Sequence, residues 1–291
     1  MPARRTPADL SAYPDAAPGQ SVNLLFIHHS VGGQLLADQG PLQAGAEDRL
    51  SIHHTHPNGG GLRRLLRDQR YVVHEAAYSS VIGERTDLFD WLPKFQQHMP
   101  RILGTAHQDQ LLTGATNRVI LFKSCFPNNA FRADRPGPGD PAGPVLNLTN
   151  AKATLDAVRH ELARHLDVLF VYLTAPPLRA GGTSEALWKY AAKKIMGRPT
   201  SNLEQIRAAA DARTFDDWVT SPDGWLKNYP NRNIVAFDYF DVLTGGRDSN
   251  FLRFPSNGGK DDHPSADGQR LAAAKLVAFL NRAVRYAGIV N

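Results

Sequence analysis

Short apolar segments alternate along this chain with longer segments in which apolar residues recur at helical spacing. The apolar segments end in polar or turn residues, which is typical of buried parallel strands; they are 23–30, 71–76, 117–124, 167–178 and 233–244. The amphipathic segments predict helices at 61–70, 86–103, 149–167 and from near Ser265 onward. Strands separated by helices predict an α/β fold, a doubly wound parallel sheet between two helical layers.

Polar side chains gather where the predicted strands end. His28, His29 and Ser30 close the first strand in the stretch LLFIHHSVGG, and the 117–124 strand runs into SCFPNN with its two asparagines. Near the other end of the chain, DDHPS leads into the last helix. Ligands of such sheets bind beyond the carboxyl ends of the strands, so we expect a functional site there.

These residues supply the parts of a nucleophilic hydrolase. A serine hydroxyl such as that of Ser30 needs a base, for which His263 is the candidate, and the base needs an orienting carboxylate. Asp261 and Asp262 both precede His263 closely. The developing oxyanion needs aimed donors, which the Ser30 backbone N–H and the side chain of Asn128 or Asn129 could provide.

The same blocks resemble the SGNH hydrolases, also called GDSL-type esterases. FIHHSVG stands where that family has its Gly-Asp-Ser block, FKSCFPNN where it has Gly-x-Asn-Asp, and DDHPSADGQRLA where it has Asp-x-x-His before a helix. The order of Ser, Asn, Asp and His is the same. The resemblance implies a flavodoxin-like sheet and, without any cofactor or metal, hydrolysis of a small-molecule or carbohydrate ester such as an acetylated sugar.

The chain departs from the family pattern at three places. Two histidines replace the Gly-Asp pair, and Lys260 stands where the family has its aspartate. We predict Asp261 as the acid, because a carboxylate adjacent to His263, such as that of Asp262, usually points away. The resemblance implies further oxyanion donors at Gly83 (with Ser80 as a second donor candidate) and Asn128. His28 and His29 point to opposite faces of the strand, so one of them is expected to line the site, and we take His29 as the substrate contact.

Composition limits the partners, the location and the domain organisation that we expect. The 291 residues carry a formal charge of +5 without a dense basic run, which argues against a nucleic-acid partner. No apolar run is long enough for a membrane span, and the start of the chain lacks an apolar signal core, so we expect a cytoplasmic protein. Cys125 is the single cysteine, so no internal disulfide is possible.

We expect a flexible leader at 1–21 and one domain at 22–291 with an inserted helical cap at 179–232. The sequence does not indicate an oligomeric state.

Two other functions stay open. The departures from the family pattern favour a non-catalytic binding protein on the same fold. A metal-dependent hydrolase is the second alternative, since several histidines lie close in sequence and imidazoles bind zinc well; they are His28, His29, His53, His54 and His56.

Overall fold

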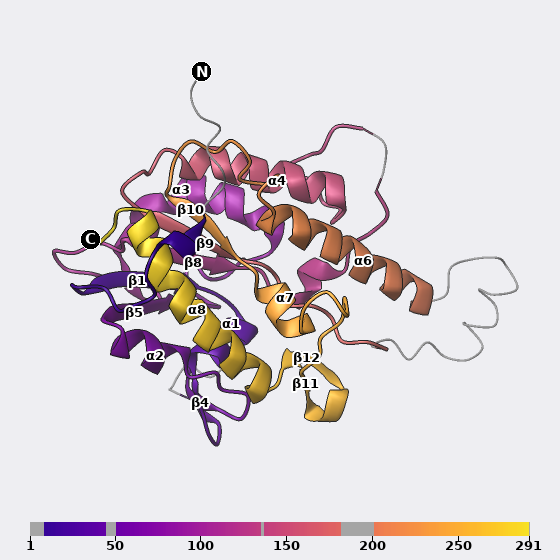
Figure 1. Cartoon of the computed structure of the whole chain (residues 1–291), viewed down its shortest axis with the longest axis horizontal. Helices are drawn as coiled ribbons and strands as arrows, with labels where there is room; N and C mark the ends of the chain where they lie inside the picture. The colour runs from indigo at the N-terminus through magenta and orange to yellow at the C-terminus, as the bar shows by residue number, and fades with distance from the viewer. Residues whose placement is uncertain (1–8, 45–50, 135–136, 182–200, 291) are drawn as a thin grey trace, which may run out of the picture.

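A seven-stranded sheet forms the centre of the computed structural model, which describes residues 9–44, 51–134, 137–181 and 201–290 (Figure 1). The strand order is β10-β9-β8-β1-β5-β6-β7, and all neighbours are parallel except the pair of β6 and β7 at one edge. The strands are β1 (Val22–Ile27), β5 (Tyr71–Ala76), β6 (Thr105–His107), β7 (Gln110–Leu111), β8 (Val119–Lys123), β9 (Leu169–Leu173) and β10 (Ile234–Phe237).

Helices cover both faces of this sheet, and each face has its own apolar core. One face packs against α1 (Ser30–Leu36), α2 (Leu62–Asp68), α7 (Tyr239–Thr244) and α8 (Ala266–Tyr286). The other packs against α3 (Trp91–Gly104), α4 (Leu148–Leu162) and α6 (Ser201–Thr220). Along β1, Leu24 and Phe26 enter the first core, whereas Leu25 and Ile27 enter the second. The expected three-layer α/β/α architecture is therefore confirmed.

The elements outside the sheet are short. Two small sheets consist of β2 (Asp38–Gln39), β3 (Gln43–Ala44) and β4 (His53–His56), and of β11 (Pro255–Ser256) and β12 (Asp261–Pro264). Single 3₁₀ turns lie at Leu10–Ala12, Leu88–Asp90, Phe126–Asn129 and Asn257–Gly259.

The segment 233–244, expected as a single strand, divides into two elements. Strand β10 ends at Phe237, and α7 begins at Tyr239. Asp238 between them caps the helix, because its Oδ1 accepts a hydrogen bond from the Asp241 N–H at 2.7 Å. An apolar run cannot by itself distinguish a strand that continues from a short buried helix.

Part of the expected cap at 179–232 falls on residues 182–200, including Trp188 and Tyr190, which lie outside the described residues. The described part packs into the second core: Trp225 is fully buried, and its Nε1–H donates to the Leu155 carbonyl at 2.8 Å.

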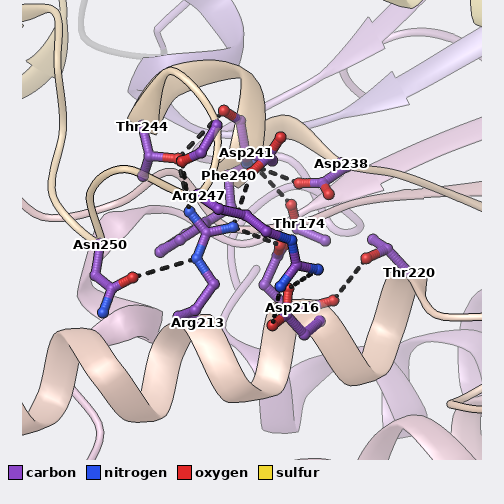
Figure 2. Close-up of polar contacts among 12 residues, drawn as sticks. Thr174, Arg213, Asp216, Thr220, Asp238, Phe240, Asp241, Thr244, Arg247 and Asn250 are labelled. Atoms are coloured by element: carbon purple, nitrogen blue, oxygen red, sulfur yellow. Dashed lines mark hydrogen bonds and ion pairs between the residues drawn. The ribbon is translucent and has the colours of Figure 1, made fainter.

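Helix α6 is also held by polar contacts at the carboxyl ends of β9 and β10. The Arg213 guanidinium reaches Asp241 at 2.8 Å and Thr244 at 2.8 Å, and it lies 3.9 Å from the buried Asp216 (Figure 2). Burial and the nearby Asp238 charge raise the pKa of Asp216 well above its ordinary value.

The segment before β1 lies against α8. Tyr13 packs edge-on against Tyr286 with ring centroids 5.8 Å apart, and Arg282 pairs with Asp15 at 3.0 Å. These contacts involve the second half of the expected leader. Among the helices that the structure describes, none has the length and apolar composition needed to cross a membrane.

Strand β1 occupies the switch point of the sheet. The chain leaves β1 to form β5 on one side of it and later enters β8 on the other. The loop that follows β1 therefore lies in the crevice where such folds bind ligands. Ser30, the first residue of α1, comes directly after this loop.

Candidate active site

Ser30, His263 and Asp261 form a hydrogen-bonded chain at the carboxyl end of β1. The Ser30 hydroxyl lies 2.9 Å from His263 Nε2, and His263 Nδ1 lies 2.8 Å from Asp261 Oδ1. Because a carboxylate only accepts, Nδ1 carries the proton, and Nε2 is left to accept from the serine hydroxyl. These three predicted residues are thus brought together across 233 positions of sequence.

The turn between β1 and α1 presents Ser30. His29 is the N-cap of α1, and its carbonyl accepts the N–H groups of Gly32 at 2.9 Å and Gly33 at 3.1 Å. Both glycines are needed for close approach: a Cβ on Gly32 would lie 2.3 Å from the His28 Cβ, and one on Gly33 would lie 1.9 Å from the Ser51 carbonyl oxygen. The sequence HHSVGG therefore folds a helix start tightly onto the end of a buried strand.

Strand β12 holds the histidine and its acid. Asp261 Oδ1 also accepts the His263 backbone N–H at 3.1 Å, and Oδ2 accepts from the Ser256 hydroxyl at 3.3 Å. Partial burial opposes ionisation of Asp261, but the hydrogen bonds from His263 outweigh it and lower the pKa of this carboxyl. The ring of Phe126 packs edge-on against the imidazole of His263, with centroids 5.2 Å apart.

Asp262, the alternative acid, has a different partner. Its Oδ1 accepts the Arg179 backbone N–H at 2.8 Å. It also lines a pocket of about 620 Å³ between residues 130–133, Leu178 and the first turns of α6.

The residues expected to donate to an oxyanion are engaged within the protein. The Gly83 N–H donates to the Ser80 hydroxyl at 3.0 Å. Asn128 Nδ2 donates to Asp87 Oδ1 at 2.8 Å and to the Cys125 carbonyl at 3.3 Å, while its Oδ1 accepts the Leu88 N–H.

Asn129, the other candidate, is equally occupied: its Nδ2 donates to the carbonyls of Ala175 at 2.9 Å and Pro176 at 2.8 Å. In the described part of the chain, by contrast, no acceptor takes the Ser30 backbone N–H at the start of α1.

His29 ties the loop after β5 to the nucleophile turn. Its ring stacks on Tyr78 with centroids 3.6 Å apart, and its Nε2–H donates to the Gly83 carbonyl at 2.7 Å. Burial, with smaller contributions from the charges of Lys123, His28 and Lys94, lowers the pKa of His29 to about 4. The ring is therefore neutral near neutral pH.

A charged cluster beneath this turn was not foreseen from the sequence. His28 is fully buried, and its Nε2 lies 3.3 Å from Glu75 Oε2, while Glu75 Oε1 accepts from Arg63 at 2.7 Å. Lys123 at the end of β8 is also fully buried, with its Nζ 3.3 Å from Cys125 Sγ. The signal available in the sequence was a charged residue at the end of each of two apolar strands, YVVHEA and VILFK.

The histidines considered as metal ligands do not form a common site. His28 faces Glu75 and His29 faces the Gly83 carbonyl, whereas His56 Nδ1 accepts the Asn58 N–H at 2.9 Å. Among the residues the structure describes, no group of three or more His, Cys, Asp or Glu side chains is arranged to hold a metal ion.

Comparison with known proteins finds only structural likenesses of low similarity. No protein-family model matches the chain, and no curated protein matches it. One similar solved structure is a carbohydrate esterase family 2 enzyme with a carbohydrate-binding domain, from Corynascus thermopiles (Myceliophthora fergusii). It shares 14% identity over 94% of this chain and 68% of that chain, with a TM-score of 0.38. A second solved chain shares 12% identity over 93% of this chain and 98% of that chain, with a TM-score of 0.39.

Proposed function

We propose that this protein is a serine esterase of the SGNH type that works through an acyl-enzyme. The observation that carries the proposal is the chain of hydrogen bonds from the Ser30 hydroxyl through His263 to Asp261, at 2.9 and 2.8 Å. Its location at the switch point of a doubly wound sheet supports the proposal, because that crevice is accessible to ligands.

The reaction has two stages. As the Ser30 oxygen attacks the ester carbonyl, His263 Nε2 takes the hydroxyl proton, and the Asp261 carboxylate stabilises the imidazolium that forms. His263 then returns the proton to the leaving alcohol, and the acyl group stays on Ser30. In the second stage the same base activates water, which releases the acid and restores the serine.

The Ser30 N–H is the oxyanion donor that the geometry supports best, since no acceptor in the described residues takes it. The roles predicted for Gly83 and Asn128 require each to exchange a present partner, Ser80 or Asp87, for the substrate oxygen. His29 then acts by holding the Gly83 loop in place.

For the substrate we propose a small acyl ester, such as an acetylated carbohydrate. The pocket of about 620 Å³ that Asp262 lines, next to His263 in sequence, could receive the alcohol part. Its wall carries both signs of charge, from Arg132, Arg207, Glu204 and Asp262, which is suited to a polar rather than an aliphatic alcohol.

Hydrolysis of p-nitrophenyl acetate by the wild type and by Ser30→Ala tests the proposal. We expect Ser30→Ala to lower kcat by about 10³-fold or more, as loss of such a nucleophile does in serine hydrolases. Ser11→Ala, at an exposed serine in the first 3₁₀ turn, is the matched control and should keep the wild-type rate.

Each assay is repeated with EDTA. Equal rates for the wild type and Ser30→Ala would favour the binding-protein alternative. Loss of activity with EDTA alone would favour the metal-dependent one.

A further inference from the structure

The ring of His28 faces two groups that can only accept hydrogen bonds. Its Nδ1 lies 3.0 Å from the His29 carbonyl oxygen, and its Nε2 lies 3.3 Å from Glu75 Oε2. A neutral imidazole carries one proton, so one of its nitrogens would present a lone pair to an oxygen. A ring that makes both hydrogen bonds must be protonated on both nitrogens.

The Glu75 side is built to hold such a charge. Burial opposes ionisation of Glu75, but the hydrogen bond from His28 and the charge and hydrogen bond of Arg63 outweigh it and lower the pKa of Glu75 to about 2. The carboxylate therefore stays ionised and lies between the His28 ring and the Arg63 guanidinium. Because His28 is fully buried and the Glu75 side chain is only 9% exposed, solvent screens this pair weakly.

Other charged groups around His28 come from the neighbouring elements. Lys123 of β8, one position past the register pair of Ile27 and Phe122, is fully buried on the neighbouring strand, and its Nζ lies 3.3 Å from Cys125 Sγ. The adjoining His29 ring is neutral near neutral pH, and the turn of α1 above His28 contributes Gly32 and Gly33, which carry no charge. Glu75 is thus the carboxylate that lies against the His28 ring.

The His28 Nδ1–H has a specific target. The His29 carbonyl that accepts it also receives the N–H groups of Gly32 and Gly33, so this one oxygen anchors the first turn of α1. Ser30 is the first residue of that helix. A charge-assisted hydrogen bond to this carbonyl fixes the backbone from which the Ser30 hydroxyl and N–H project.

We propose that His28 is a buried imidazolium that positions the nucleophile turn, with Glu75 as its counter-ion and His29 as a neutral neighbour with a separate task. The positioning role rests on the proposed function, whereas the charge of His28 does not. The two histidines of the HHS stretch therefore differ in protonation: one supports the helix that carries Ser30, and the other joins the Gly83 loop to it.

NMR of the full chain labelled with ¹⁵N-histidine tests the charge directly. At about pH 8, above the ordinary histidine pKa of about 6.5, both ring nitrogens of His28 should give the protonated signature. His29 should show one protonated and one unprotonated nitrogen. Loss of the signals in His28→Gln and His29→Gln assigns them. An unprotonated nitrogen on His28 at this pH would overturn the proposal, whatever the activity of the protein.

Glu75→Gln tests the positioning role. The variant keeps the shape and an acceptor oxygen but removes the counter-ion of His28. We expect the pH profile of kcat/KM to gain a titration that the wild type lacks. Above it, kcat/KM should fall by about 10- to 100-fold, the worth of one charge-assisted hydrogen bond.

His74→Gln on the same strand is the matched control, because His74 bonds to Asn23 and not to the cluster, and it should add no such titration. A Glu75→Gln profile parallel to that of the wild type would overturn the positioning role. Full activity of Ser30→Ala together with a doubly protonated His28 would overturn the proposed esterase function and the positioning role. The proposed charge of His28 would still stand.

Discussion

Asp261 and Asp262 flank the same histidine, and exchanging each for asparagine distinguishes their roles. Asp261 Oδ1 accepts both the ring Nδ1–H and the backbone N–H of His263, whereas Asp262 accepts the Arg179 N–H. Asp261→Asn removes the charge that stabilises the imidazolium, and the new amide can donate to Nδ1 and so favour the wrong tautomer. Asp262→Asn keeps an oxygen that can accept from Arg179.

The hydrogen bonds of Asp261 determine how much kcat should fall in Asp261→Asn. A hydrogen bond to a charged group contributes about 1.5–3 kcal/mol, which corresponds to about 10- to 150-fold in rate. The wrong tautomer adds to this loss, while the exposure of the Asp261 side chain, 41%, moderates the charge effect through solvent screening. We therefore expect kcat to fall by about 10²- to 10³-fold in Asp261→Asn and by less than about threefold in Asp262→Asn.

Steady-state hydrolysis of p-nitrophenyl acetate gives kcat for both variants, and thermal melting confirms that both are folded. Equal losses in the two variants, or an Asp261→Asn enzyme that keeps more than about a tenth of the wild-type kcat, would refute this assignment of the acid. A selective loss in Asp262→Asn would transfer the role to that residue.

Two further predictions concern stability. Gly32→Ala should lower the free energy of unfolding by at least about 1–3 kcal/mol in urea titrations, because its methyl group would overlap the His28 Cβ; an unchanged midpoint would contradict the close packing of this turn. Asp216 has a raised pKa in the folded state, so the fold binds its proton more tightly than the unfolded chain does. Its contribution is present at low pH and is lost as pH rises above the ordinary aspartate value of about 3.9. Asp216→Asn should abolish that part of the pH dependence of the urea midpoint, whereas Asp217→Asn, in the surface pair with Arg247, should retain it; equal slopes in all three proteins would contradict the raised pKa.

The arrangement of the strands followed from local patterns. Runs such as LLFI and VILF are apolar at every position, which is typical of a strand buried on both faces, and the structure places β1 and β8 at the centre of the sheet. The pattern failed after Phe237, where α7 (YFDVLT) continues a largely apolar run directly after the strand. There the choice between strand and helix depends on the Asp238 cap and on packing against α8.

The sequence by itself determined which residues stand at the ends of the strands, because a parallel sheet brings those ends to one edge whatever the loops do. It therefore indicated one edge of the sheet for Ser30 and the asparagines, whereas the family resemblance singled out the DDH stretch before the last helix. Only the tertiary structure decided what each side chain contacts: that Asp261 rather than Asp262 meets His263, that Asn128 is occupied by Asp87, and that Glu75 and Arg63 lie beneath His28. The physical reason is that hydrogen bonding and protonation depend on partners within a few ångströms, and folding draws those partners from distant parts of the chain.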